Sequence, residues 1–326
     1  TKLTFFEALA VLGFAVFADA PVDVLVLEVG MGGEWDSTNV ADGDVAVFAP
    51  ISLDHTDRIG STISEIARTK SGVIKPGSIV VSAAQVSEAE AILREKAAKL
   101  GSQIYFAGQD FAVVSSLPNK VGQQIAVRSL TSEYTNLQLP LHGEFQSENA
   151  VLALAAVEAF IGGGSQRLLD DVVRVSFADV ASPGRLQIVD VDPLVILDGA
   201  HNPHGATAVS QALATSFSNP KTVAVISMVH DKDTDGFVDN LDAAIDHYVV
   251  TQSSSDRAQS ASELAKKLSD KFGSSKVSLQ ARVSSAIEQA KSLVKDSPNG
   301  AVLVTGSLTL VGEVLAIKQK EAELDD

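Results

Sequence analysis

The stretch VDVLVLEVGMGG, residues 22–33, joins an apolar run to a glycine-rich turn, and Glu28 stands where the two meet. A second apolar run, VAVFAPIS at 45–52, leads in the same way into LDHTD, which contains His55. Parallel strands that are buried on both faces read as continuous apolar runs, and open α/β sheets bind ligands beyond the carboxyl ends of their strands. The two runs therefore predict neighbouring strands, 22–28 and 45–52, with Glu28 and His55 around one cation or phosphate.

Each of these residues also has a structural interpretation when it is taken alone. A carboxylate at the end of a strand, such as Glu28, also suits a helix cap or a solvated turn, and a lone histidine is more often structural than a ligand. The occurrence of both at the ends of neighbouring predicted strands is what favours a binding site.

Length and composition indicate about two globular domains. The chain has 326 residues, of which 45% are hydrophobic, enough for a large core and two domains of ordinary size. The sequence has no uninterrupted apolar run of about 18 residues, the length that a membrane span needs. The stretch LTFFEALAVLGFAVFADA at 3–20 lacks a basic start and contains Glu7, so it predicts an amphipathic or buried helix rather than a signal peptide.

The charge balance narrows the class of partner. The sequence has no cysteine, which excludes disulfides and fits a reducing compartment such as the cytoplasm. The net charge is −16 and no Lys/Arg cluster follows one face, so nucleic acid is not an expected partner. An acidic protein that handles an anionic substrate needs local cations, and a bound metal with a few placed Lys or Arg side chains would suffice.

The first half of the chain alternates helix and strand and then changes to short alternating runs. Thr62 and Glu65 are spaced as a capping box and mark the start of one helix. The runs between 103 and 141 predict a local antiparallel patch. The elements expected elsewhere in this half are helices at 4–18, 62–71, 87–100, 146–160 and 166–177 and strands at 22–28, 45–52 and 78–83.

The second half begins after Ala181-Ser182-Pro183-Gly184, where Pro and Gly interrupt both helix and strand. Strands that alternate with helices there predict a second, doubly wound sheet. The expected strands are 194–198, 222–228, 247–251, 276–280 and 301–305, and the expected helices are 204–216, 234–245, 260–272, 283–294 and 308–319.

Two features at the start of this second half predict ligand contacts. The apolar run at 194–197 ends in Asp198-Gly199-Ala200-His201-Asn202, again with polar groups at the end of a strand. The alternative is an Asx turn in which Asp198 caps the next helix. Arg185 follows the Pro-Gly pair, and a guanidinium there can grip a phosphate by two parallel hydrogen bonds; the alternative is a surface salt bridge.

Several motifs occur in an order that resembles the folylpolyglutamate synthase and dihydrofolate synthase family of the Mur ligase superfamily. They are LEVGMGGEWDSTN, SLDHTDRIGSTISEIARTKSGVIKPG, GEFQSENAVLALAAVEAF, SPGRLQIV, ILDGAHNPHGA, HDKD and VTGSLTLVGEV. Together they span essentially the whole chain, and DGAHNP favours the folate branch of the superfamily. The resemblance implies an α/β protein with a Mur-ligase-type central, ATP-binding domain at 1–181, whose mostly parallel sheet carries a small antiparallel patch. A Rossmann-like glutamate ligase domain at 182–326 would follow it.

The resemblance also implies the magnesium ligands. Glu28, His55 and Lys70 resemble them, with Lys70 carbamylated, because a carbamate supplies the oxygen ligands that Mg²⁺ prefers whereas an ammonium would repel the ion. On its own, Lys70 reads as an ordinary charge on a helix surface. With Arg185, the residues Lys70 and His55 are the implied catalytic residues.

The resemblance assigns further residues to ATP and to glutamate. Gln146 and Asn149 are implied contacts of the adenine or ribose. Arg185 and Asp198, with His201 nearby, are implied to contact ATP from the second domain, so that domain closure assembles the site. The region implied to handle the incoming glutamate contains Lys232, Asp233, Arg257 and Ser307.

The implied reaction is ATP-dependent amide ligation by a cytoplasmic monomer of folate and one-carbon metabolism. A carboxylate of folate or dihydropteroate attacks the γ-phosphate of ATP and gives an acyl phosphate, from which the amine of L-glutamate displaces phosphate. Mg²⁺ and cationic side chains stabilise the charge that develops. Two other interpretations remain open: a superfamily ligase that acts on a cell-wall peptide precursor, and a non-catalytic nucleotide-binding relic.

Two departures from the family pattern are visible in the sequence. The P-loop pattern GxxxxGK[ST], which in the family precedes the first helix seen here, does not occur in the 326 residues. We therefore expect the chain to be a fragment that does not turn over by itself. Glu34 stands where the family usually has arginine, which predicts an altered substrate preference.

Overall fold

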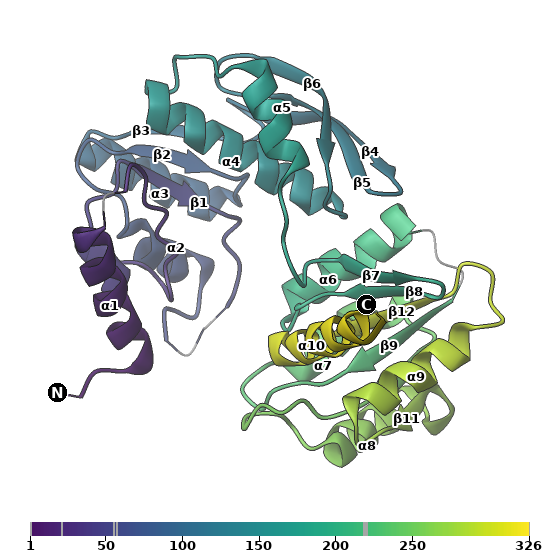
Figure 1. Ribbon diagram of the computed structural model, residues 1–326. Helices are drawn as coiled ribbons and strands as arrows, with labels where there is room; N and C mark the ends of the chain where they lie inside the picture. Colours follow the sequence, from purple (N-terminus) through teal and green to yellow (C-terminus); the bar gives the residue numbers. More distant parts are fainter. Residues whose placement is uncertain (1, 21, 55, 57, 218–220, 326) are drawn as a thin grey trace. The chain divides into compact units, whose positions relative to one another are not determined.

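The computed structural model describes the chain as two compact units. The described residues are 2–20, 22–54, 56, 58–217 and 221–325 (Figure 1). The first unit comprises residues 1–114, 126–135 and 148–170, and the second comprises residues 115–125, 136–147 and 171–326. The predicted domain boundary at residue 181 remains a prediction. None of the described helices combines the length and the apolar character that a bilayer crossing requires.

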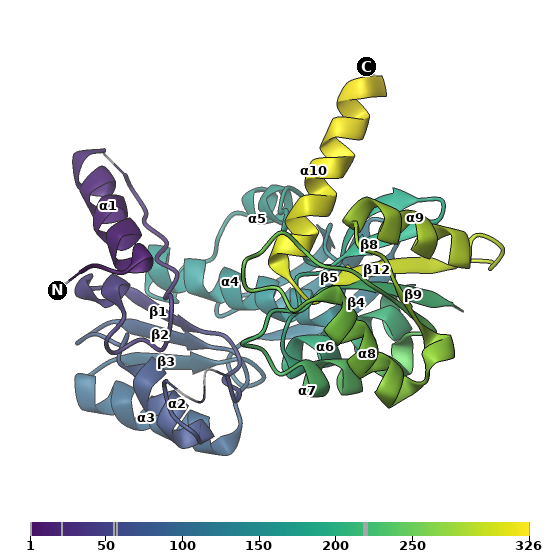
Figure 2. The same cartoon turned by 90° about the horizontal axis from the view of Figure 1, so that it is seen from below.

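The first unit contains a three-stranded parallel sheet. Its strands are β1 (Val45–Phe48), β2 (Ile79–Ser82) and β3 (Gln103–Phe106), which lie in that order and pair in parallel. Figure 2 shows α2 (Ile63–Ser71) and α3 (Ser87–Leu100) on one side of this sheet. The alternation of strand and helix in the sequence is thus confirmed, except that residues 103–106 belong to this parallel sheet and not to the antiparallel patch.

Apolar side chains from both helices and the sheet make the core of this layer. Ile66 of α2 and Leu93 of α3 are completely buried against Val80 and Phe106 of the strands. Burial of one such side chain contributes roughly 1.5–3 kcal/mol. The start of α2 is fixed by the predicted capping box, in which the side chains of Thr62 and Glu65 each accept a hydrogen bond from the other's backbone N–H.

The predicted strand at 22–28 is wrong. Residues 22–28 have no strand assignment, and Val24 and Val26 are 57% and 88% exposed. A strand needs hydrogen-bond partners for its backbone N–H and C=O groups, and 22–28 pairs with no strand in the part of the chain that the structure describes. The preceding helix α1 (Phe5–Asp19) agrees with the prediction in its bounds but buries no residue.

A second three-stranded sheet follows along the chain. It consists of β4 (Ala112–Asn119), β5 (Gly122–Arg128) and β6 (Glu133–Leu139), in that order. The two-residue connection between β4 and β5 is too short for a parallel crossover, so this pair runs antiparallel. The predicted antiparallel patch is therefore confirmed over residues 112–128.

A buried carboxylate of helix α4 (Glu144–Gly162) binds the loop between β5 and β6 by hydrogen bonds. The next helix along the chain is α5 (Asp170–Ala178). Glu158 of α4 is completely buried. It accepts hydrogen bonds from the Ser129 and Thr131 hydroxyls, both at 2.8 Å, and from the Leu130 N–H at 2.9 Å. A buried charge is tolerated where its oxygens are hydrogen-bonded, so this cluster fixes the loop on the helix.

The second unit contains a six-stranded sheet in the order β11-β10-β9-β12-β8-β7. Five of its strands pair in parallel, and β7 pairs antiparallel with β8 at one edge. The strand β7 was not predicted, because the short run QIVDV is half-buried and carries no continuous apolar pattern. The bounds are β7 (Gln187–Val191), β8 (Leu194–Leu197), β9 (Thr222–Ile226), β10 (His247–Val250), β11 (Val277–Leu279) and β12 (Ala301–Thr305).

Helices cover both faces of this sheet, so the predicted doubly wound fold is confirmed. Figure 2 shows α6 (Pro203–Ala212), α7 (Thr234–Leu241) and α8 (Ala261–Phe272) on one side. It shows α9 (Val283–Val294) and α10 (Leu308–Asp325) on the other side. The helix predicted at 204–216 continues past α6 as a π-helical turn over Leu213–Phe217.

This topology creates crevices at the carboxyl ends of the strands. Ligands of open α/β sheets bind where adjacent strands send their following helices to opposite faces. The helices after β8, β9 and β10 pack on one face, and the helices after β12 and β11 pack on the other. The condition is therefore met between β12 and its two neighbours, β8 and β9, and again between β10 and β11. The topology of the second unit therefore predicts ligand sites at two places, beside β12 and between β10 and β11.

Candidate active site

In the first unit, the glycine-rich turn after Glu28 is pressed against the end of α2. A Cβ atom on Gly33 would lie only 2.8 Å from the carbonyl oxygen of Lys70 and 3.0 Å from that of Thr69. The backbone N–H of Glu34 donates a hydrogen bond to the Thr69 carbonyl at 3.0 Å. The turn that Glu28 enters is therefore fixed on the helical turn that carries Lys70.

The same loop is held internally by Asp36. Its carboxylate accepts hydrogen bonds from the Met31 N–H at 2.9 Å and from the Thr38 N–H and hydroxyl at 3.0 and 2.6 Å. Partial burial by itself would raise the pKa of Asp36, but the hydrogen bonds from Thr38 and Met31 outweigh it and lower the pKa. The loop thus keeps an ionised carboxylate that stabilises its turn.

Sequence reasoning missed Gln85, which fixes the chain beyond β1. Its amide nitrogen donates to the Ala49 carbonyl at 3.0 Å and to the Ser82 hydroxyl at 3.1 Å, and its amide oxygen accepts from the Ile51 N–H at 2.9 Å. Gln85 therefore sets the path of the segment that leads to His55. His55 itself lies outside the described residues.

The donor types in this unit suit a hard cation. Mg²⁺ is usually bound by one or two carboxylates together with phosphate oxygens and water. Glu28 supplies an exposed carboxylate, and Lys70 is half-buried at the end of α2. Among the described residues, which do not include His55 or Asp57, no group of three or more Asp, Glu or His side chains is placed to hold a metal. A magnesium site at Glu28, His55 and a carbamylated Lys70 remains a prediction.

The predicted adenine or ribose contacts lie at the start of α4. Gln146 is buried and Asn149, one turn further along, is exposed. Gln123, which sequence reasoning also missed, lies 1% exposed beside this helix start. Its amide nitrogen donates to the carbonyl oxygens of Leu141 at 2.8 Å and Gly143 at 2.9 Å. The entry to α4 is thus held rigidly, while the roles of Gln146 and Asn149 remain predictions.

In the second unit, Asp198 forms a buried cradle at the end of β8. Its side chain is 3% exposed, and its two oxygens accept hydrogen bonds from the Ala200 N–H at 2.8 Å and the Leu186 N–H at 2.9 Å. Burial raises the pKa of Asp198, although these hydrogen bonds and the charge of Arg185 act in the opposite direction. Leu186 has φ of +44°, a strained conformation for a branched residue, and the bond to Asp198 holds it.

The Asp198 cradle places Arg185, the residue before Leu186. The Gly199 N–H donates to the Gly184 carbonyl at 2.8 Å, which ties the segment of Arg185 to the loop after β8. A Cβ atom on Gly199 would lie 3.5 Å from the Arg185 Nη1 atom, so the guanidinium lies beside this loop. His201 is in the same loop, with its Nδ1 atom 2.9 Å from the Gly199 carbonyl oxygen. The structure therefore brings Arg185, Asp198 and His201 together.

The alternative interpretation of Asp198 is correct in part. The hydrogen bond from the Ala200 N–H, two residues on, is an Asx turn. The cap of the next helix is Asn202 instead, whose side chain accepts from the Gly205 N–H at 2.8 Å.

The predicted glutamate residues lie on three loops at the carboxyl ends of β9, β10 and β12. Arg257 pairs with Asp231 at 3.1 Å, and the His230 N–H donates to the Arg257 carbonyl at 2.9 Å, which joins the first two loops. Asp233 caps α7 by accepting from the Gly236 N–H at 2.9 Å. Lys232 lies between Asp231 and Asp233 in the sequence, and its side chain is half-buried.

Ser307 lies on the third loop, which is fixed by its neighbour Gly306. The Gly306 N–H donates to the Ala200 carbonyl at 3.0 Å, and its φ of +96° and a Cβ position only 2.6 Å from the Ser227 carbonyl oxygen require glycine. Ser307 is buried, and its hydroxyl accepts from the Thr309 N–H at 3.2 Å. The loops after β8, β9 and β12 therefore meet, while the roles of Lys232, Asp233, Arg257 and Ser307 remain predictions.

Comparison with known proteins defines the class of this fold and site. Residues 1–157 match the Mur ligase middle domain, and residues 184–308 match the Mur ligase glutamate ligase domain. The fold is thus that of a Mur ligase with its two α/β domains.

Individual relatives narrow the class to one family. A dihydrofolate synthase/folylpolyglutamate synthase from Mycobacterium tuberculosis is 42% identical over 94% of this chain and 67% of its own length. A folylpolyglutamate synthase from Lacticaseibacillus casei is 35% identical over 74% of this chain, which spans 56% of that relative. The structure of Mycobacterium tuberculosis folylpolyglutamate synthase complexed with ADP has a TM-score of 0.91 and 40% identity, over 97% of this chain and 72% of that one. The chain belongs to the dihydrofolate synthase/folylpolyglutamate synthase family of ligases.

The contact between the glycine turn and α2 can be tested with Gly33→Ala. The added methyl group would overlap two backbone carbonyl oxygens, so we expect a loss of about 1–3 kcal/mol in the free energy of unfolding and faster hydrogen exchange at the Glu34 amide. Gly43→Ala is the matched control, because its Cβ would meet nothing closer than 3.7 Å. Equal stability of the two variants would contradict the contact.

The buried state of Asp198 can be tested with Asp198→Asn. The amide of asparagine keeps one acceptor oxygen for two N–H donors. We therefore expect the free energy of unfolding of the variant at pH 4 to be about 1–3 kcal/mol lower than that of the wild type. The pKa of Asp198 is higher in the folded state than in the unfolded state. The free energy of unfolding of the wild type therefore falls as the pH rises from the unfolded-state pKa through the folded-state pKa, whereas asparagine does not titrate. The difference in free energy of unfolding between the wild type and Asp198→Asn, measured by urea denaturation, should therefore become smaller between pH 4 and pH 7. Asp256→Asn, at an exposed position, is the control, and a gap that widens with pH would contradict the assignment.

Proposed function

We propose that this chain provides the middle and glutamate ligase domains of an enzyme that uses ATP to add L-glutamate to folate or to dihydropteroate. The observation that carries the proposal is the buried Asp198, which places Arg185 beside the loop after β8. Family membership supports the reaction type, and the acceptors are those of the dihydrofolate synthases and folylpolyglutamate synthases among the relatives. The chain spans 67% and 56% of the two relatives described above, so the activity of the whole protein is part of the proposal.

The residues of the second unit act on the phosphates of ATP. Arg185 is exposed, and its guanidinium can form two parallel hydrogen bonds to a phosphate. Asp198 accepts hydrogen bonds from two backbone N–H groups and so positions Arg185, while the remaining lone pairs of its carboxylate are acceptors for an ATP contact. His201, held by the Gly199 carbonyl, presents its second ring nitrogen as a hydrogen-bonding group near the same loop.

The residues of the first unit act on the cation and on the acceptor. Glu28 and a carbamylated Lys70, with His55, would hold Mg²⁺, which when bound neutralises charge on the phosphate oxygens. The carbamate also removes a positive charge from the end of α2. The glycine turn that follows Glu28 is held on the end of α2, where the Glu34 N–H donates to the Thr69 carbonyl.

The glutamate binds through its two carboxylates and reacts through its amine. Lys232 and Arg257 are cations on neighbouring loops of an otherwise acidic protein, and cations of this kind suit the two carboxylates. Asp233 and Ser307 hold the starts of α7 and α10 and so keep these loops in place. We place the reaction in the cytoplasm and expect the enzyme to work as a monomer with small-molecule partners only.

The direct test is incorporation of labelled L-glutamate. The 326-residue chain contains no P-loop pattern to hold the β- and γ-phosphates, so we expect it to bind MgATP weakly and without turnover. A chimera that adds the P-loop segment of the Mycobacterium tuberculosis relative should form ADP only when both L-glutamate and an acceptor are present. Activity with a cell-wall peptide precursor in place of folate or dihydropteroate would overturn the substrate assignment, and nucleotide binding without turnover in the chimera would indicate a relic.

The role of Lys70 can be separated from that of its helix. In the chimera, Lys70→Ala should lower glutamate incorporation by roughly a hundredfold or more, because a ligand of the phosphate-bound cation is lost. Acetate should restore part of the activity, because its carboxylate can replace the carbamate. Arg68→Ala changes an exposed cation on the same helix and should leave the rate unchanged. Full activity of Lys70→Ala without acetate would refute the role.

A further inference from the structure

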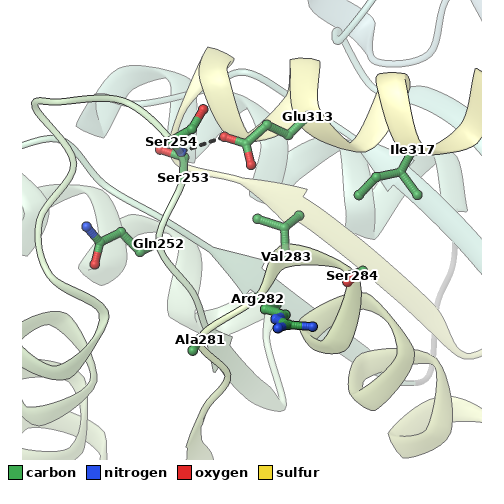
Figure 3. Close-up of a pocket in the computed structure, with 9 residues that line it drawn as sticks. All are labelled: Gln252, Ser253, Ser254, Ala281, Arg282, Val283, Ser284, Glu313 and Ile317. Atoms are coloured by element: carbon green, nitrogen blue, oxygen red, sulfur yellow. Dashed lines mark hydrogen bonds between the residues drawn. The ribbon is translucent and has the colours of Figure 1, made fainter.

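A separate cavity lies at the second crevice of the C-terminal sheet, between β10 and β11. It is an open hollow with a volume of about 490 Å³, within the range of roughly 300–1,000 Å³ that is usual for small-molecule sites. Its walls come from the loop after β10, the start of α9 and one face of α10 (Figure 3). None of the residues assigned above to ATP, magnesium or glutamate lines it.

The cavity carries one cation and one anion. Arg282 stands at the start of α9, where no side chain caps the helix, so the positive end of the helix adds to its charge. Glu313 projects from α10 and accepts a hydrogen bond from the Ser254 N–H at 2.6 Å, which fixes the carboxylate in the wall. In Figure 3, Arg282 and Glu313 lie on different sides of Val283.

This charge pair favours a zwitterion over a simple anion. An anion would meet the repulsion of Glu313 and of a chain whose net charge is −16. A zwitterion has no net charge, and it can place its carboxylate near Arg282 and the N-terminus of α9 and its ammonium near Glu313. The amide of Gln252, also in the wall, offers a further hydrogen bond to either group.

The rest of the wall favours an aliphatic side chain. Val283 is buried and Ile317 is half-buried; Figure 3 shows Val283 between the two charged groups and Ile317 one turn of α10 beyond Glu313. Contact with these side chains would remove an apolar ligand group from water at roughly 25 cal/mol per Å². A second carboxylate, as in L-glutamate, would have no second cation among the lining residues.

We propose that the cavity between β10 and β11 is a binding site for a free aliphatic α-amino acid, separate from the ligase site. The carboxylate of the ligand contacts Arg282, its ammonium contacts Glu313, and its side chain packs on Val283 and Ile317. The site gives the glutamate ligase domain a way to sense an amino acid that is not its substrate.

The test is binding of L-leucine to the full 326-residue chain, measured by saturation-transfer NMR and by titration. L-leucine should bind, whereas leucinamide, which lacks the carboxylate, and N-acetyl-leucine, which lacks the ammonium, should not. Arg282→Gln and Glu313→Gln should each weaken binding at least tenfold. Glutamine at 313 keeps an oxygen for the Ser254 N–H, so this variant removes the charge and leaves the wall intact.

The controls separate this proposal from the proposed ligase function. Lys266→Ala removes an exposed cation of α8 in the same unit and should leave L-leucine binding unchanged. MgATP binding, measured on every variant, should also be unchanged and shows that the protein is folded. If the wild-type chain binds MgATP but not L-leucine, the amino-acid site is overturned and the proposed ligase function is not. The site is likewise overturned if Arg282→Gln and Glu313→Gln both still bind L-leucine.

Discussion

The buried carboxylate of Asp198 is the constraint on which the C-terminal site depends. It satisfies two backbone N–H groups from separate segments, one in the loop after β8 and one in the chain just before β7. The second of these belongs to Leu186, whose positive φ is costly for a side chain of that shape. Arg185 precedes it in the chain, so the backbone position from which its side chain starts is set by a hydrogen bond that Arg185 does not make.

Charge placement explains how so acidic a chain could bind the nucleotide and the amino acid that we propose. With a net charge of −16, the protein as a whole repels anions, but salt screens that field beyond roughly 8 Å. Cations at the carboxyl ends of strands therefore act locally. Arg185, Lys232, Arg257 and Arg282 all lie at such ends in one sheet, and the two crevices of its topology separate them into different sites.

The sequence predicted the elements best where a local signal and the tertiary environment agree. The Thr62–Glu65 capping box marks the start of α2, and the continuous apolar runs of β9, β10 and β12 are buried on both faces, as parallel strands should be. Residues 22–28 failed because apolar composition does not supply a hydrogen-bonded neighbour. Strand β7 was missed because a half-buried edge strand lacks that composition.

The candidate site was predictable only as far as single residues. Polar groups at the end of an apolar run indicated Asp198, the position after the Pro-Gly pair indicated Arg185, and the resemblance indicated Lys70. The partners that hold them left no pattern: Gln85 and Gln123 act through backbone carbonyls distant in sequence, and Leu186 matters through its dihedral angle. Such contacts follow from the packed fold, which a single sequence does not encode as a local motif.

The most direct test of this account is a double-mutant cycle on MgADP affinity with Asp198→Asn and Arg185→Ala. If Asp198 acts by placing Arg185, each single variant should weaken binding about tenfold or more, and the double variant should be no weaker than Arg185→Ala alone. Additive losses would show that the two residues act independently, and unchanged affinity in Arg185→Ala would contradict the account at its base.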